Sequence, residues 1–109
     1  MSNADHLRDA NPWQPMRDPL DLAHLGKLLE EVNELGAAIS RCLIQGIDER
    51  EPVTGKPNRE WLEDEIADVA AGCQLVGQRF HLDQVSIKHR IDRKKAHLRQ
   101  WHRHLGSEV

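Results

Sequence analysis

Two acidic clusters in the chain have the residue types and the spacing of a metal site. The first contains Glu30, Glu31 and Glu34, and the second contains Glu65 and Asp68. Residues three or four apart lie on the same side of an α-helix, so each cluster can direct two carboxylates toward one point. Converging carboxylates repel one another and are stable mainly around a hard cation such as Mg²⁺. The pattern therefore predicts a divalent metal site of the kind that binds phosphate groups.

The neighbours of the second cluster indicate that it is more than a solvated acidic surface. Glu65 and Asp68 share a helical row with Trp61 and Gly72. This row lies beside the expected apolar stripe, so both acids should be partly buried, and a buried carboxylate requires a cation or hydrogen-bond donors. In the first cluster Glu31 borders the apolar stripe, whereas the other two acids point further away. A single ExxE pattern usually belongs to a solvated helix face, and it is the pair of clusters that favours metal binding.

Three expected helices must position these acids. Apolar residues recur at helical spacing in three segments, which are residues 20–45, 58–80 and 84–104. Residues 46–59 contain two Gly, two Pro and many charges, which predicts a long loop. Pro12, Pro15 and Pro19 predict an extended arm before the first helix.

Length and composition favour one all-α domain. The chain has 109 residues, with three Trp, one Phe and no Tyr, so aliphatic residues must form the core. We expect three long helices in a domain over residues 20–105, preceded by the N-terminal arm, residues 1–19. A chain of this size buries little apolar surface alone, so we expect a helical bundle completed by homo-oligomerisation, as a dimer or a tetramer.

Other features bear on the compartment. No apolar run approaches the roughly 20 residues that a membrane span requires, and the N-terminus lacks a signal-peptide pattern. Cys42 and Cys73 lie in apolar helical patterns without a CxxC spacing, so both are expected to be reduced core residues. We therefore expect a cytoplasmic protein that makes no membrane contact.

Charge is distributed unevenly along the chain, although the formal net charge is only −3. Thirteen acidic and five basic residues lie between Asp18 and Asp68, whereas residues 79–104 contain eight Lys or Arg, five His and two Asp. The third expected helix places Lys88, Asp92 and Lys95 on one face. We interpret the two lysines as contacts for a triphosphate, the alternative being a solvated face that pairs with the acidic helices.

The two acidic clusters also carry a family resemblance. Glu30-Glu31-Val32-Asn33-Glu34 and Glu65-Ile66-Ala67-Asp68 resemble the EExxE…ExxD signature of the MazG-like all-α nucleoside triphosphate pyrophosphohydrolases, which are related to dimeric dUTPases and dCTP pyrophosphatases. The resemblance covers roughly residues 20–100. Two features differ from the usual pattern. The 30 residues between Glu34 and Glu65 form a long linker, and Asp92 stands where relatives often have Asn.

The resemblance implies hydrolysis of a nucleoside triphosphate between its α- and β-phosphates, giving a monophosphate and pyrophosphate. The positions that match the Mg²⁺ ligands, for which Mn²⁺ is a substitute, are Glu31, Glu34, Glu65 and Asp68. Glu30, Glu31 and Glu34 would be the catalytic acids, with Glu30 placed to orient or deprotonate the attacking water. The expected substrate contacts are Lys88, Asp92, Lys95 and Trp61, where the indole either stacks on the base or fills an oligomer core.

Two other interpretations remain open from the sequence. One is a non-catalytic helical interaction module that binds nucleic acid or protein through the basic third helix. It leaves Glu65 and Asp68 unexplained, and the negative net charge argues against nucleic acid as the partner. The other is a family member that has kept the acidic cluster but lost its activity.

Overall fold

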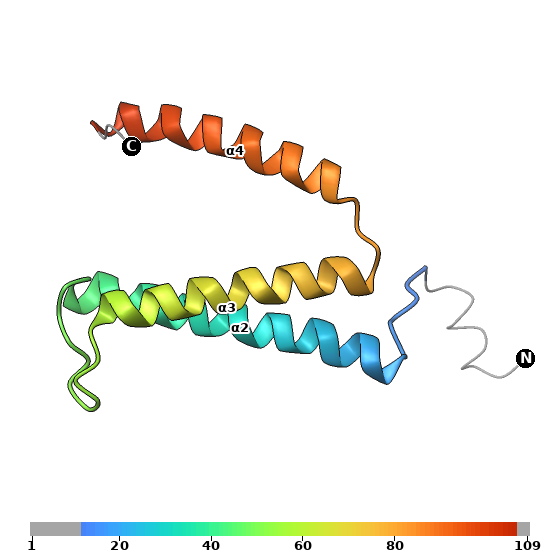
Figure 1. Ribbon diagram of the computed structural model, residues 1–109, viewed down its shortest axis with the longest axis horizontal. Helices are drawn as coiled ribbons and strands as arrows, with labels where there is room; N and C mark the ends of the chain where they lie inside the picture. Colours follow the sequence, from blue (N-terminus) through green and yellow to red (C-terminus); the bar gives the residue numbers. More distant parts are fainter. Residues whose placement is uncertain (1–11, 107–109) are drawn as a thin grey trace, which may run out of the picture.

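The computed structural model describes residues 12–106 and contains three helices, which are α2 (Pro19–Gln45), α3 (Asn58–Arg79) and α4 (Gln84–His104). Figure 1 shows α2 and α3 side by side in opposite directions, with α4 turning back after α3 and running toward the loop end of the hairpin, apart from both helices. The predicted all-α fold with three helices is confirmed. Residues 1–11 of the expected arm lie outside the described residues, and residues 12–17 are not helical.

The start and end of α2 follow from local chemistry. Asp18 is the N-cap, and its Oδ1 accepts hydrogen bonds from the backbone N–H groups of Leu20 (2.8 Å) and Asp21 (3.1 Å). These bonds, that of Asp21 first, lower the pKa of the Asp18 carboxyl. Pro19 occupies the first helical position, where its missing N–H costs nothing. Gly46 ends the helix with a φ of 104°, a conformation that favours glycine.

Close packing of α2 on α3 depends on a glycine. Leu25, Leu28 and Leu35 are half-buried between the two helices. A Cβ atom at Gly72 would lie 3.0 Å from Leu28 Cδ1, so a larger residue there would push the helices apart. Gly72 therefore sets the separation of the two helices one turn beyond Asp68.

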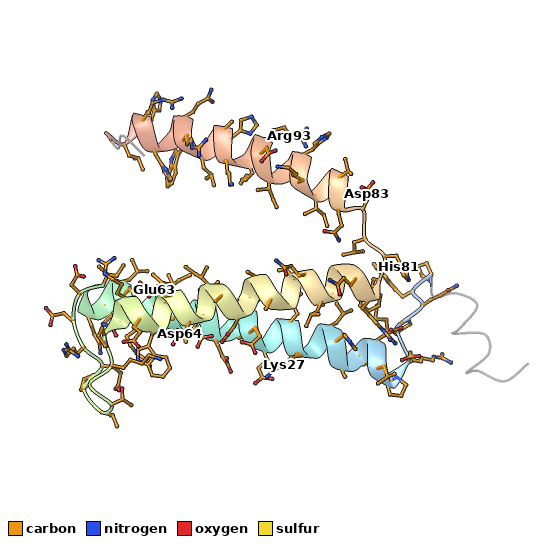
Figure 2. All side chains as sticks on the ribbon, viewed as in Figure 1. Lys27, Glu63, Asp64, His81, Asp83 and Arg93 are labelled. Atoms are coloured by element: carbon orange, nitrogen blue, oxygen red, sulfur yellow. The ribbon has the colours of Figure 1, made fainter. Side chains whose placement is uncertain are left out.

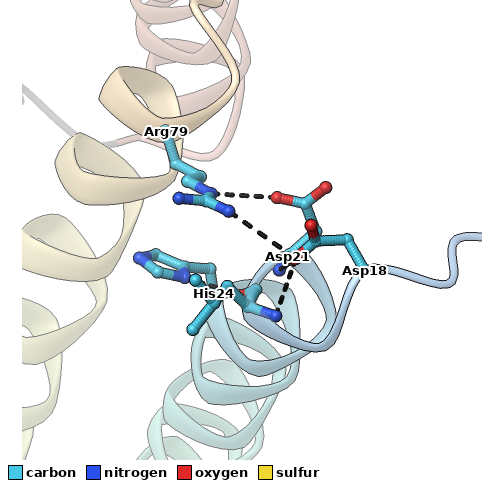
Figure 3. A network of polar contacts seen from close by, with 5 residues as sticks. Asp18, Asp21, His24 and Arg79 are labelled. Atoms are coloured by element: carbon cyan, nitrogen blue, oxygen red, sulfur yellow. Dashed lines mark hydrogen bonds and ion pairs between the residues drawn. The ribbon is translucent and has the colours of Figure 1, made fainter.

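An ion-pair network joins the open end of the α2–α3 hairpin (Figure 3). Arg79 Nε donates to Asp21 Oδ1 at 2.9 Å, and Arg79 Nη2 lies 3.7 Å from Asp18 Oδ1. The arginine lies in the last turn of α3 and the two aspartates lie at the start of α2, where each charge is also favoured by the helix dipole. The network therefore fixes these two helix ends to each other.

The other end of the hairpin is fixed by a buried amide. Asn58 has no exposed surface, and its Nδ2 donates to Gln45 Oε1 (3.1 Å) and to the Gly46 carbonyl (3.0 Å). Its backbone N–H donates to the Glu49 carbonyl at 2.9 Å. One residue thus connects the end of α2, the loop and the start of α3.

Helix α4 is separate from the other two. His81 has a positive φ of 51°, and Asp83 caps α4 by accepting from the Ser86 N–H at 3.0 Å. The only extensive helix packing in the described chain is that of α2 on α3, so α4 contacts either helix marginally at most. Figure 2 shows Asp83 at the turn before α4 and Arg93 within α4, both apart from the hairpin.

The core within one chain is small. Ala38 and Val76 are the buried apolar residues among residues 12–106. The radius of gyration is 19.9 Å, whereas a compact chain of this length has about 13 Å. The chain alone therefore leaves its bundle incomplete, as expected for a bundle completed by oligomerisation.

The expected apolar stripes divide into a covered part and an uncovered part. On α2 the exposed members of the expected stripe are Val32, Ile39 and Leu43. Leu22 and Leu29 lie outside that stripe and extend the exposed line, in which the steps are seven, three, seven and four residues. On α3, Ile66 and Cys73 are exposed. The expectation that Cys73 is a core residue is wrong for the single chain, because nothing in the described residues covers that side of α3. No helix among residues 12–106 is long and apolar enough to cross a membrane.

The role of Asn58 can be tested by replacing it with Ala. Asn58→Ala removes two hydrogen bonds and leaves the Gly46 carbonyl without that donor, so the free energy of unfolding should fall by about 2 kcal/mol. Urea unfolding at a fixed protein concentration measures the change. The control is Asn33→Ala, which alters an exposed Asn on α2 and should change stability by less than about 0.5 kcal/mol. Equal losses in the two variants would contradict the structural role of Asn58.

Candidate metal centre

Three of the predicted acids meet between α2 and α3. Glu31 projects from α2, and Glu65 and Asp68 project from successive turns of α3. One carboxylate oxygen from each lies within 4.8 Å of the other two. The antiparallel packing places Glu31 opposite the two acids of α3, so the helix pair assembles the cluster from distant parts of the sequence. We call these residues the acidic triad.

The donor atoms of the triad fit a hard divalent cation. Glu31 Oε2 and Glu65 Oε2 are buried and have no hydrogen-bond partner among the described residues, and unsatisfied buried carboxylate oxygens are costly. Two oxygens on opposite sides of a Mg²⁺ ion lie about 4 Å apart, because each Mg–O distance is about 2.1 Å. The oxygens of the triad lie within 4.8 Å of one another, a limit somewhat above this value. The triad could therefore hold a metal ion after small side-chain movements.

Electrostatics within the triad favour a cation as well. Burial, followed by the negative charges of Asp68 and Glu31, raises the pKa of Glu65. Lys27 compensates part of this charge, since its Nζ lies 3.4 Å from both Glu31 Oε1 and Glu30 Oε2. The hydrogen bond to Glu31 is the main reason that the pKa of Lys27 is raised. Lys27 is exposed and reaches the triad from its edge, so it leaves the buried oxygens unpaired.

The remaining acids of the first cluster lie beside the triad. Glu34 is outside it, but partial loss of water contact and then the charges of Glu31 and Glu65 raise the pKa of Glu34. Glu30 is exposed and pairs with Lys27. The structure therefore brings together three of the four predicted metal ligands, with Glu34 next to them and Glu30 on the outer surface.

A pocket of about 490 Å³ adjoins the triad through a shared residue, Glu65. Its walls come from α2, α3 and the loop between them, and the lining residues are Glu34, Ala37, Ala38, Arg41, Glu51, Thr54, Trp61 and Glu65. This volume lies within the range of small-molecule sites. We call it the loop pocket. A pocket of similar volume, about 500 Å³, lies at the turn between α3 and α4, but its lining includes none of the predicted acids.

The loop pocket owes its shape to an ordered loop. The carboxylate of Glu51 accepts hydrogen bonds from the backbone of Val53 (3.0 Å) and from the backbone and hydroxyl of Thr54 (both 2.7 Å). Arg50 Nη1 donates to the Gly55 carbonyl at 2.9 Å. These bonds fold the tip of the loop back on itself, so that Glu51 and Thr54 are held at the pocket wall.

Trp61 forms the α3 side of the loop pocket. It is half-buried, and the Lys56 ammonium lies 4.1 Å from the centroid of its ring while pairing with Asp64 at 2.6 Å. The Arg41 guanidinium lies 5.7 Å from the same centroid. The predicted base-stacking residue thus lies at a pocket next to the acids, with two cations close to its ring.

The predicted contacts on α4 are not brought to the triad within one chain. Lys88 Nζ lies 3.4 Å from Asp92 Oδ2, and both side chains are exposed. Lys95 is exposed as well. Because α4 does not pack extensively on the hairpin, these three residues can reach the triad only through movement of α4 or from another copy of the chain. Their role in substrate binding stays a prediction.

Sequence reasoning missed three residues of the loop pocket, which are Arg41, Glu51 and Thr54. Arg41 had a usable signal, since it follows Glu34 by seven residues, or two helical turns, on the same side of α2. Glu51 and Thr54 had no such signal, because no local pattern indicates where a loop of this length folds.

The chain matches no protein-family model, no curated protein and no solved structure.

The repulsion within the triad predicts how stability depends on pH. The folded-state pKa of Glu65 lies above the ordinary value of 4.5, so the folded protein binds more protons than the unfolded chain between the two pKa values. Stability should therefore decrease as pH rises through that interval. In EDTA, Glu65→Gln should raise the melting temperature near pH 7, and this gain should vanish near pH 4.

Thermal unfolding followed by circular dichroism between pH 4 and pH 8 measures this difference at equal protein concentration. The matched control is Glu63→Gln, which replaces an exposed glutamate two residues away (Figure 2). If Glu65→Gln stabilises the protein equally at all pH values, or no more than the control does, then the Glu65 carboxylate is not repelled by the neighbouring acids.

Proposed function

We propose that the protein is a Mg²⁺-dependent nucleoside triphosphate pyrophosphohydrolase of the MazG-like type. The reaction would be hydrolysis between the α- and β-phosphates. The observation that carries the proposal is the acidic triad with its unpartnered buried oxygens, next to a pocket of nucleotide size. The EExxE and ExxD patterns supply those acids at the positions that the family resemblance requires.

The triad would hold the metal, with Glu31, Glu65 and Asp68 as its ligands. A bound Mg²⁺ supplies Lewis-acid polarisation of the phosphoryl oxygens and neutralises their charge. Mg²⁺ keeps several waters and takes few protein ligands, which suits a triad that leaves coordination positions open. Lys27 would retain its contact with Glu31 and orient that carboxylate.

Glu34 is the side chain best placed to accept a proton from the attacking water. It lines the loop pocket beside the triad, and its pKa is raised, which makes its carboxylate a better base near neutral pH. The water oxygen would bond to one of the two phosphorus atoms of the α–β bridge as the bond from that atom to the bridging oxygen breaks, giving a nucleoside monophosphate and pyrophosphate. Glu30, the base suggested by the sequence, is less favourably placed because it does not line the loop pocket and its carboxylate pairs with Lys27.

We propose further that the active form is a homo-oligomer built from dimers. The exposed stripe on α2 has the seven-residue spacing of a helix-bundle seam. The apolar line of α4 is also exposed, including Ile91, Leu98 and Trp101. A second copy would offer the same exposed apolar faces, and its basic α4 is complementary in charge to the acidic hairpin. Lys88 and Lys95 could then reach the triphosphate from the neighbouring copy.

The second candidate function is a non-catalytic interaction module that uses α4. It is supported by the separation of α4 from the hairpin and by the exposure of its Lys and Arg side chains. It offers no reason for three acids to converge between α2 and α3. We therefore favour the enzyme.

The enzymatic proposal predicts a metal-dependent release of pyrophosphate. The wild-type protein should release pyrophosphate from at least one nucleoside triphosphate in Mg²⁺ and should lose this activity in EDTA. Asp68→Asn keeps the side-chain shape but weakens metal binding, so kcat/KM should fall at least about 100-fold. Glu63→Gln is the control on the same helix and should retain activity. If no triphosphate in a panel of standard and modified bases is hydrolysed, the proposal is wrong.

The oligomer proposal predicts that charged substitutions at two exposed apolar positions affect the oligomer differently. Ile39→Glu places a charge in the α2 stripe and should shift the protein to a smaller species in sedimentation velocity. Val53→Glu changes the loop tip, where Val53 is 90% exposed, and should leave the oligomer intact. A wild-type protein that sediments as a folded monomer would contradict the proposal.

A further inference from the structure

We propose that the end of the loop pocket next to the loop binds the nucleobase, and that Arg41 selects bases with a carbonyl at C6 of a purine or at C4 of a pyrimidine. The inference rests on the proposed function for the identity of the ligand as a nucleoside triphosphate. It adds the orientation of that ligand, the residue that determines specificity and the chemical class of the preferred base.

The loop pocket has two different ends. Glu34 and Glu65 lie at the end that adjoins the triad. Arg41 follows Glu34 by two helical turns, about 10 Å along α2. Trp61 precedes Glu65 by one turn on the antiparallel α3, so it lies toward the same end as Arg41. A nucleotide with its phosphates at the triad would therefore extend its base toward Arg41, Trp61 and the loop.

The end next to the loop suits a flat heteroaromatic ring rather than a phosphate chain. Ala37 and Ala38 line the α2 side without bulky groups, and Trp61 contributes an aromatic side chain opposite them. Stacking of a base on an aromatic side chain is favourable for any base, since every base has a π-face. Polar groups reach this end from Arg41 and Thr54, where they can contact the edge of a ring.

Arg41 is a group at this end that remains available to a ligand, and the buried Nε1 of Trp61 is a second donor without a partner among the described residues. The Arg41 guanidinium contacts the Trp61 ring but forms no ion pair or hydrogen bond within residues 12–106. Glu51, the nearest acceptor on the loop, already accepts three hydrogen bonds from Val53 and Thr54. These bonds hold its carboxylate in the loop. The end of the pocket next to the loop therefore offers several free hydrogen-bond donors and few free acceptors.

An excess of donors favours a base whose edge presents acceptors. The guanidinium carries five N–H donors and no acceptor. Hypoxanthine and guanine present the O6 and N7 acceptors that arginine binds in a bidentate manner, and uracil presents O4. Adenine and cytosine present an amino group at the equivalent position, so two donors would face each other. The pocket should therefore prefer purines with a carbonyl at C6 and pyrimidines with a carbonyl at C4.

The test compares two pairs of substrates, ITP with ATP and UTP with CTP. The members of each pair differ mainly in a carbonyl against an amino group on a ring of the same size. For the wild-type protein, KM should be at least about tenfold lower for the carbonyl member of each pair, as expected for a hydrogen bond from a charged group. Arg41→Met should raise KM for ITP and UTP by about the same factor and should change KM for ATP and CTP less than twofold. Because Arg41 contacts the base and not the reacting atoms, kcat should change little.

Two further variants test whether the effect comes from the planar guanidinium of Arg41 and not from the loss of a positive charge. Arg41→Lys retains the positive charge but loses the planar fork, so it should lose most of the preference while folding normally. Arg93→Met removes an exposed arginine of α4 (Figure 2) and should leave both pairs of KM values unchanged. Equal KM values within each pair, a preference for amino bases, or an equal loss for all four substrates in Arg41→Met would each overturn the inference.

Failure of the inference can be distinguished from failure of the proposed function. Calorimetry can measure the affinity for the α,β-methylene analogues of ITP and ATP, which cannot be hydrolysed between the α- and β-phosphates. If the wild-type protein hydrolyses triphosphates but binds the two analogues equally, the base subsite is wrong and the proposed function stands. If it hydrolyses no triphosphate of the panel of standard and modified bases but binds the ITP analogue more tightly, the proposed function is wrong and the subsite stands.

Discussion

Repulsion among carboxylates held between two helices is the constraint on which the structure depends most. Glu31, Glu65 and Asp68 converge to within 4.8 Å, and two of their oxygens are buried without a partner. Burial and neighbouring negative charge raise the pKa of Glu65, so the packed hairpin disfavours the charged state that this carboxyl adopts in water. Lys27 offsets this only from the edge. Such an arrangement is costly for stability alone, and a divalent cation would turn the same geometry into a favourable one.

The rest of the hairpin holds the acids in this position. Gly72 allows α2 and α3 to approach closely, the Arg79 network fixes one end, and Asn58 fixes the other. Asn58 also ties the loop to both helices, and the hydrogen bonds to Glu51 fold the loop tip against the pocket. The fixed hairpin therefore positions both the triad and the loop pocket, although the chain has almost no buried apolar core of its own. The apolar stripes of α2 and α4 are exposed in a single chain. We propose that a second copy of the chain covers them.

Periodic segments allowed the helices to be predicted closely, because amphipathic spacing and caps are local properties. Asp18, Pro19 and Gly46 act where their chemistry indicates. The meeting of Glu31 with Glu65 and Asp68 was also predictable, since two ordered helical motifs suffice to define it. Local patterns could not show which half of an apolar stripe faces the neighbouring helix, and Cys73 was misplaced for that reason. They also could not place α4, nor the Glu51 and Thr54 side chains, since these positions depend on contacts between distant residues and on copies of the chain.

The most direct test of the central claim is anomalous X-ray diffraction from crystals soaked in Mn²⁺, used in place of Mg²⁺. The account predicts a peak between α2 and α3, with carboxylate oxygens of Glu31, Glu65 and Asp68 at coordination distances of about 2.0–2.6 Å. A crystal at saturating Mn²⁺ that shows no peak there, with the three side chains turned apart into solvent, would contradict it.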